Sequence, residues 1–437
     1  MDARITALSA LIACRKQNAW SDGSLKEYIV RDRLDRRDAA LATRLCYGVL
    51  QNRMLLDFYL SSFLKGRLKD LQPVVADILR LGAYQLVFLE KIPASAAVNE
   101  AVDETRRYAN SRAAGLVNAV LRALASAAAE KRLPEPKDLA VRYSHPAPLV
   151  ELLRDSLGEA RLEPFLRCDN EAPETVVQRN PLKTKGTDLF LELQNQEVSI
   201  RRHSWLPDCY CLSGTGSIET MADFRDGKFY VQDAAAHLAA MALSLSPGMQ
   251  VLDACAAPGG KSFSAALAMA DRGRILACDI HPHKLELIEK GAERLGLTCI
   301  TPVLQDAAAE NPEWLGGMDA VLADVPCSGL GVIRKKPDVR YKSLDGLEAL
   351  PAVQRAILEN VCRYVRPGGT LVYSTCTVLR RENEDVAEEF LKNHPEFAPE
   401  PIPTPAALGL ENAGMLTLLP CEHDSDGFFI CRLRKRA

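Results

Sequence analysis

The chain has 437 residues and an apolar fraction of 47%, which suggests roughly two to four globular domains. Its 13 cysteines form no CxxC pair, and it has neither an apolar leader nor a long uncharged apolar stretch. These features argue against a secreted, disulfide-rich or membrane-spanning protein, so we expect a cytoplasmic chain with reduced thiols.

The net charge of −3 is unevenly distributed along the chain. Residues 1–140 carry 22 Lys and Arg against 16 Asp and Glu, while the remaining residues carry 32 against 41. A basic first domain is typical of a module that meets a phosphate backbone, and equally of a helical surface crossed by salt bridges. Charge alone leaves both interpretations open.

Residues 1–142 are predicted to form an all-helical domain. Apolar residues recur there at helical spacing, for example at Val117, Val120, Leu121 and Leu124. The pattern ends in the proline-containing stretch LPEPKDL (133–139). Residues 143–228 then mix short helical patches with a strand-like TVVQRN (175–180), which predicts a small α+β domain.

Strand-like and helical stretches alternate over residues 229–437. Such alternation predicts a mostly parallel, Rossmann-like α/β sheet covered on both faces, with an antiparallel strand near the C-terminus. The strand-like runs are 229–231, 250–252, 275–278, 300–304, 320–323, 370–374 and 428–433. Helical stretches between them include 234–243, 262–269, 283–295, 352–364 and 384–392.

Three of these strands end in chemically distinctive sequences. DACAAPGGKS (253–262) places two glycines before a helix, while DVPCSG (324–329) and STCT (374–377) each carry a cysteine. In open α/β sheets, ligands bind at the carboxyl ends of the strands. Although most free cysteines are buried like small hydrophobes, Cys327 and Cys376 are therefore predicted to face a ligand.

The expected ligand contains a nucleoside but no polyphosphate. GGKS (259–262) looks like part of a phosphate-binding loop, but that motif requires glycine at position 255, which is cysteine here. Carboxylates follow successive strands at Asp253, Asp279, Asp306 and Asp324. One such Asp is ordinary turn chemistry, whereas four beside a glycine loop favour S-adenosyl-L-methionine, whose cationic sulfonium and amine suit acidic neighbours.

No metal site is expected. Cys209 and Cys211 with His203 are the nearest to a ligand set, but their spacing matches no common metal site.

The sequences DACAAPGGKS, ADVPCSGLG (323–331), YSTCT with ENE (382–384), and DGFFICRL (426–433) resemble those of RNA cytosine-C5 methyltransferases. Within that family the chain is similar to the bacterial Sun or Fmu type, which acts on 16S ribosomal RNA. The resemblance covers the whole chain and is specific across 229–437. It implies a NusB-like RNA-binding domain over 1–142, an intermediate domain over 143–228, and a class I methyltransferase domain over 229–437.

The chemistry of this family explains the two cysteines. C5 of cytosine becomes nucleophilic enough to take a methyl group only after a thiolate adds to C6. Spacing does not say which cysteine attacks, since DNA cytosine methyltransferases use the PC cysteine, here Cys327. The resemblance implies that Cys376 attacks and Cys327 assists release, with Asp324 meeting the base and Lys261 nearby.

The resemblance also implies the residues that bind the cofactor. Asp279 corresponds to the acid that binds the ribose, and Asp306 to the acid on the adenine side. The full set is Ala254, Cys255, Ala256, Ala257, Pro258, Gly259, Gly260, Asp279, Asp306 and Asp324.

The loop GVIRKKPDVR (331–340) follows Cys327 closely, and its four cations are expected to contact phosphate. The expected partners are 16S rRNA and S-adenosylmethionine, with no membrane and a monomeric chain. The alternatives are a transfer RNA cytosine-C5 methyltransferase and a non-catalytic RNA-binding protein with a methyltransferase fold. An unrelated nucleotide-dependent enzyme is disfavoured by the failed phosphate-loop match.

Overall fold

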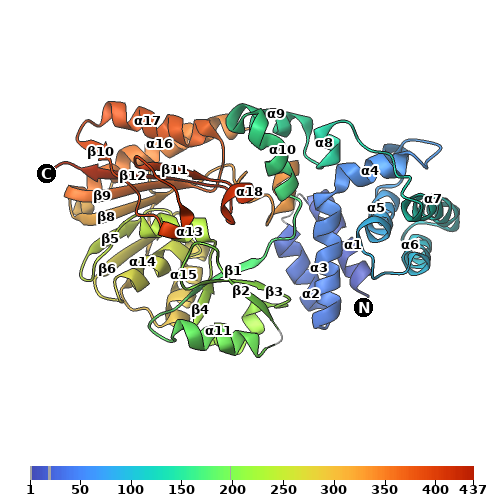
Figure 1. Ribbon diagram of the computed structural model, residues 1–437, viewed down its shortest axis with the longest axis horizontal. Helices are drawn as coiled ribbons and strands as arrows, with labels where there is room; N and C mark the ends of the chain where they lie inside the picture. The colour runs from blue at the N-terminus through green and yellow to red at the C-terminus, as the bar shows by residue number, and fades with distance from the viewer. Residues whose placement is uncertain (1, 18–20, 197) are drawn as a thin grey trace. The chain divides into compact units, whose positions relative to one another are not determined.

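The computed structural model describes residues 2–17, 21–196 and 198–437, which form two compact units (Figure 1). The N-terminal unit comprises the described residues up to Arg154, together with Glu159–Glu171 and Ile333–Lys342. The C-terminal unit comprises Asp155–Gly158, the described residues of Ala172–Val332, and Ser343–Ala437. The domain boundaries expected after residues 142 and 228 remain predictions.

The N-terminal unit is helical, which confirms the fold class expected there. Gly82 of α5 lies so close to α7 that an added Cβ would come within 2.5 Å of Leu121 Cδ1. The buried apolar stripes of α1, α3, α5, α6 and α7 form one core. The helices are α1 (Ala3–Gln17), α2 (Ser21–Asp32), α3 (Arg36–Gln51), α4 (Arg53–Ser61), α5 (Pro73–Phe88), α6 (Ala94–Tyr108), α7 (Ser111–Ala129), α8 (Leu139–Arg142), α9 (Ala147–Leu157) and α10 (Glu159–Cys168).

Phosphate contacts were expected for the four cations of the loop at 331–340, and for Arg340 this expectation is wrong because its side chain is buried. Its side chain is 1% exposed, on the short helix η4 (Pro337–Tyr341), which belongs to the N-terminal unit. The guanidinium donates to the Gln51 carbonyl at 2.9 Å, Asn170 Oδ1 at 2.8 Å and the Asp169 carbonyl at 3.2 Å. Arg340 is therefore an internal anchor, because carbonyl oxygens of the same unit accept hydrogen bonds from both of its terminal nitrogens.

A four-stranded antiparallel sheet opens the C-terminal unit, in the order β2-β3-β1-β4. One face packs on α11 (Gly186–Gln194), through residues such as Val177 and Leu189. The other face, including Val176 and Tyr230, shares a core with the helices of the larger sheet. The strands are β1 (Thr175–Arg179), β2 (Ser199–Arg202), β3 (Cys209–Ser213) and β4 (Phe229–Val231).

The larger sheet has eight strands in the order β10-β12-β9-β8-β5-β6-β7, with β11 paired to β12. Strands β5 to β9 run parallel, and β12 pairs antiparallel with β9, β10 and β11. The strands are β5 (Gln250–Asp253), β6 (Arg274–Asp279), β7 (Ile300–Leu304), β8 (Met318–Asp324), β9 (Val365–Thr375), β10 (Phe397–Pro399), β11 (Met415–Leu418) and β12 (Phe428–Lys435).

Helices cover both faces of this sheet, as Figure 1 shows for α13, α14 and α15 on one side and α16 and α17 on the other. Alternate residues of a strand enter different cores, for example Val251 and Leu252 of β5. The remaining helices of the C-terminal unit are α12 (Ala222–Arg225), which packs with the smaller sheet, and α13 (Ala234–Met241), α14 (Gly260–Ala268), α15 (Pro282–Leu295), α16 (Leu350–Val361), α17 (Glu384–Asn393) and α18 (Pro420–His423).

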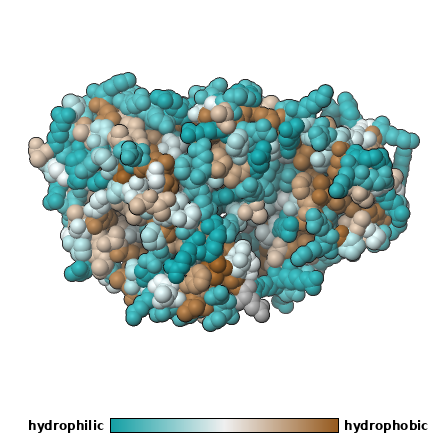
Figure 2. Space-filling view, viewed as in Figure 1, coloured by the Kyte–Doolittle hydropathy of each residue, from teal (hydrophilic) through white to brown (hydrophobic). Residues whose placement is uncertain are grey.

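The face of the molecule in Figure 2 is mostly hydrophilic, with apolar residues scattered over it. Within the described part of the chain, no helix is both long and apolar enough to cross a lipid bilayer.

Candidate active site

The glycine loop between β5 and α14 is shaped by one residue with positive φ. Gly259 has φ of 110°, and an added Cβ would lie 2.5 Å from the ring of Phe263. Backbone bonds tie the loop to both neighbouring strands, since Ala254 N donates to the Leu322 carbonyl and Ala256 N to the Cys278 carbonyl. The loop is thus held with its backbone along the carboxyl edge of the sheet.

Asp253, the last residue of β5, is hydrogen-bonded to the start of α14 on the other side of this loop. Its side chain is buried, and Oδ2 accepts a hydrogen bond of 2.6 Å from Ser262 Oγ at the start of α14. Burial raises the pKa of this carboxyl to about 7. Asp253 therefore joins strand to helix, and we assign it no direct contact with a ligand.

Lys261 and Asp324 form an ion pair between two elements. Lys261 lies in the first turn of α14, and Asp324 is the last residue of β8. Lys261 Nζ lies 2.6 Å from Asp324 Oδ2, and Ser374 Oγ donates to Asp324 Oδ1 at 2.7 Å. Burial by itself lowers the pKa of Lys261, but the charge of Asp324, its hydrogen bond and the charge of Asp253 together outweigh burial, and the pKa rises. The pair therefore holds a proton on Lys261 next to a carboxylate, an arrangement suited to passing a proton to a bound base.

The two cysteines singled out in the sequence lie side by side. Cys327 Sγ and Cys376 Sγ are 3.3 Å apart, on the loops that follow the paired strands β8 and β9, and both side chains are half-buried. The hydrogen bond to Cys376 is the largest cause of a raised pKa at Cys327, followed by burial. The proton of the pair is thus favoured on Cys327. A thiol that keeps its proton can donate it to the neighbouring sulfur of Cys376.

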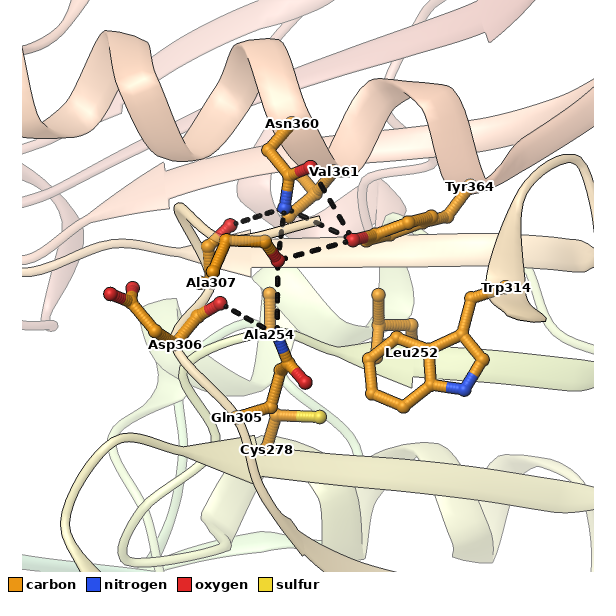
Figure 3. A pocket seen from close by; sticks show the side chains of 11 residues that line it. Leu252, Ala254, Cys278, Gln305, Asp306, Ala307, Trp314, Asn360, Val361 and Tyr364 are labelled. Carbon is orange, nitrogen blue, oxygen red and sulfur yellow. Dashed lines mark hydrogen bonds between the residues drawn. The ribbon is translucent and has the colours of Figure 1, made fainter. Parts of the chain in front are cut away.

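A small pocket lies at the ends of β5, β6 and β7 (Figure 3). Ala254, Cys278 and Asp306 line it together with Trp314 and Tyr364, so its walls are mostly apolar. Figure 3 shows Asn360 at the top, where its amide donates to the carbonyls of Ala307 and Ala309.

The predicted acids lie at different places on this edge of the sheet. Asp306 is exposed at the pocket, where Oδ1 accepts from Ala308 N at 2.9 Å. Asp279 directly follows the pocket residue Cys278, and its Oδ1 accepts from His281 N at 2.9 Å. Asp324 belongs to the cluster with Lys261. The structure thus brings Lys261 and Asp324 together, and Cys327 and Cys376 together, with Asp306 at the neighbouring pocket.

Sequence reasoning missed several polar residues around the thiols. Ser374, which holds Asp324, and Glu382, which belongs to the quoted ENE sequence, received no role. Gln354 carried a readable signal, because a glutamine occupies the helical stripe otherwise formed by Ile357, Leu358 and Val361. A buried polar residue at such a position calls for a partner.

Two family models match the chain. Residues 240–434 match the model for the 16S rRNA methyltransferase RsmB/F, and residues 1–126 match the NusB family. The probable ribosomal RNA small subunit methyltransferase B of Bacillus subtilis is 36% identical over 99% of this chain and 98% of its own length. That of Synechocystis is 34% identical over the full length of both chains.

A solved structure shares the whole arrangement of elements. The crystal structure of PH0851 matches with a TM-score of 0.79 and 26% identity, over 98% of each chain. Together with the relatives, this extends the similarity from the catalytic sequences to the helical N-terminal part. The chain therefore belongs to the ribosomal RNA small subunit methyltransferase B family and is an RNA methyltransferase of that family.

Proposed function

We propose that this chain transfers a methyl group from S-adenosyl-L-methionine to C5 of one cytosine in 16S rRNA, through a covalent bond between Cys376 and C6. The contact of 3.3 Å between the sulfurs of Cys327 and Cys376, beside the Lys261–Asp324 pair, is the observation that supports it most directly. The relatives favour ribosomal over transfer RNA, because their names specify the small ribosomal subunit.

The residues present suit S-adenosylmethionine. The apolar pocket at Ala254, Cys278 and Trp314 would take the adenine ring, with Asp306 at its edge. Asp279 would bind the ribose hydroxyls, and the loop from Ala254 to Gly260 would bring backbone groups close to the rest of the cofactor. When bound, the cofactor supplies an electrophilic methyl group on a cationic sulfur.

The attack begins at Cys376. Its thiolate adds to C6 of the cytosine, and the electron pair of the ring moves toward N3, which takes a proton held between Lys261 and Asp324. C5 is then electron-rich and takes the methyl group, while the electron pair of the broken S–CH3 bond stays on the cofactor's sulfur and N3 returns its proton to the Lys261–Asp324 pair. The target base must leave its stack to reach this edge of the sheet.

Release depends on Cys327. Once Cys376 Sγ is bonded to carbon, it is a neutral thioether and only a weak hydrogen-bond acceptor, so the largest cause of the raised pKa at Cys327 weakens. Cys327 loses its proton to solvent and takes the proton from C5. The C5–H electron pair forms the C5–C6 double bond, the bond from C6 to sulfur breaks, and Cys376 departs as a thiolate. One proton per turnover goes to solvent, which balances the methylation.

Two substitutions test the assignment of roles. Cys376→Ala should abolish methyl transfer to 16S rRNA from cells that lack the protein, because the nucleophile is gone. Cys327→Ala should retain the attack and stall at release, so a band of RNA-linked protein should appear on a denaturing gel. Methylation by the Cys376→Ala enzyme would contradict the proposal.

A further inference from the structure

The side chain of Glu382 is fully buried, and it touches the turn that carries Cys327. Its Oε2 accepts from the backbone N–H of Ser328 at 3.0 Å and from Gln354 Nε2 at 2.8 Å. Among the described residues, its Oε1 has no hydrogen-bond partner and the carboxyl has no ion-pair partner. A buried carboxylate with neutral donors alone is costly, so a purely structural site would favour a neutral residue.

Gln354 of α16 holds the other side of the same turn. Its Nε2 also donates to the carbonyl of Pro326 at 3.0 Å, and its side chain is fully buried. Pro326 and Ser328 are the immediate neighbours of Cys327. Gln354 and Glu382 thus fix the backbone directly before and directly after this cysteine, and we call this pair the Cys327 bracket.

The next residue along the chain holds the other thiol's loop. Asn383 Oδ1 accepts from the hydroxyl of Thr375, and Asn383 Nδ2 donates to the Thr377 carbonyl at 3.0 Å. Thr375 and Thr377 are the neighbours of Cys376. Adjacent residues of the ENE sequence therefore hold different cysteines, Glu382 on the release side and Asn383 on the attack side.

We infer that the Cys327 bracket positions Cys327 for the release step, so that Gln354 and Glu382 act on the breakdown of the covalent intermediate and not on its formation. The inference rests on the proposed function. In that step Cys327 must reach the C5 proton while C6 is still bonded to Cys376. The bracket supplies a turn rigid enough to keep the sulfur within proton-transfer distance.

The charge of Glu382 also acts on this thiol. It contributes to the raised pKa of Cys327, after the hydrogen bond to Cys376, burial, and the charge of Cys376. The contribution from the charge of Cys376 ends when that sulfur bonds to carbon, and the contribution from its hydrogen bond weakens. The contribution of Glu382 persists through release and makes the Cys327 thiolate a stronger proton acceptor.

Full-length Glu382→Gln and Gln354→Leu enzymes test the inference with 16S rRNA and S-adenosylmethionine. We expect the first methyl transfer to proceed at close to the wild-type rate in a single-turnover assay. Steady-state turnover should fall by about 10²-fold, which is the scale of a misplacement near 1 Å. RNA-linked protein should accumulate on a denaturing gel, as for Cys327→Ala.

Two control variants sharpen the comparison. Asn383→Ala should slow the first methyl transfer without accumulating RNA-linked protein, because it loosens the Cys376 loop. Glu389→Gln removes a carboxylate from the exposed face of α17, where Glu389 pairs with Arg355, and should change neither step.

The outcomes separate this inference from the proposed function. Linked protein with Cys327→Ala, but none with Glu382→Gln or Gln354→Leu, would overturn the inference alone. No linked protein with Cys327→Ala would overturn the proposed release step itself. Equal loss of first transfer and turnover in both bracket variants, or unfolding of both in a thermal melt, would show a merely structural role and also refute the inference.

Discussion

At the scale of single residues, the site depends on where protons are held. The hydrogen bond to Cys376 raises the pKa of the Cys327 thiol, and the proposed attack requires Cys376 to be the thiolate of the pair. The pKa of Lys261, beside the Asp324 carboxylate, is raised as well. Each arrangement comes from a short contact, 3.3 Å between the sulfurs and 2.6 Å in the ion pair. Small displacements of these atoms would therefore change the chemistry more than the stability.

A titratable residue of the N-terminal unit gives a separate test. Glu104 of α6 is buried, its Oε1 has no partner among the described residues, and burial raises its pKa to about 7. A carboxyl whose pKa is raised in the folded state contributes to the free energy of unfolding. That contribution is fully present below the pKa of the unfolded state, near 4.5, and is lost as the pH rises through the folded-state pKa of about 7. The folded unit should therefore weaken between pH 5.5 and 8.

Glu104→Gln should remove that pH dependence. We expect the opening free energy of α6, measured by amide hydrogen exchange, to fall by about 2 kcal/mol in the wild type between these pH values, and by far less in the variant. Equal falls in both proteins would show that Glu104 does not titrate in this range.

At the scale of elements, the ends of the strands determine the site. All seven strand-like runs expected from residue 229 onward form strands, because each is a short apolar run bounded by turn residues. Strand β4 joins the smaller sheet, since its pairing with β1 is a long-range contact that local pattern cannot show. Strands β10 and β11 were not predicted, since both are short and β10 ends in Pro399.

The candidate site was predictable in part. Cysteines and acids after buried runs identified Cys327, Cys376 and Asp324, because parallel strands end at one edge. The supporting residues were harder to find. Ser374 and Gln354 act through partners distant in sequence, at Asp324 and Pro326, and no spacing rule links those positions.

Asn360 of α16 is the element-scale test of the pocket. Its amide is bonded to the carbonyls of Ala307 and Ala309 at 2.8 and 3.0 Å, so Asn360→Leu would leave both without that donor. We expect affinity for S-adenosylmethionine, measured by calorimetry, to fall about tenfold, or about 1.4 kcal/mol. Glu313→Gln, an exposed position next to the pocket residue Trp314, should bind S-adenosylmethionine normally. Unchanged affinity in Asn360→Leu would argue against the pocket as the binding site.

At the scale of the whole molecule, the chain returns to its N-terminal unit after passing the turn at Cys327. Residues Ile333–Lys342 begin six positions after Cys327 yet belong to the N-terminal unit, where Arg340 is buried. The positive charges at 331–340 suggested contacts with phosphate. Charge along a chain does not reveal that the guanidinium of Arg340 already donates hydrogen bonds to carbonyl oxygens. Deleting residues 1–142 would therefore also expose this anchor, so single substitutions are better probes of RNA contact.

Arg340→Ala distinguishes an anchor from a phosphate contact. If Arg340 is an anchor, its removal takes the guanidinium donor away from the carbonyls of Gln51 and Asp169. We then expect the free energy of unfolding of the N-terminal unit to fall by about 3 kcal/mol. The salt dependence of RNA affinity should stay unchanged. A slope of log affinity against log salt that falls by about one would instead identify a phosphate contact.

The most direct test of the account is to locate the bond between protein and RNA. The Cys327→Ala enzyme, incubated with 16S rRNA and S-adenosylmethionine, should be digested with protease and nuclease and its peptides sequenced by mass spectrometry. We expect a 5-methylated cytidine nucleotide attached to the peptide that contains Cys376. A nucleotide on any other residue, or unmodified Cys376 peptide under conditions that trap the enzyme, would contradict it.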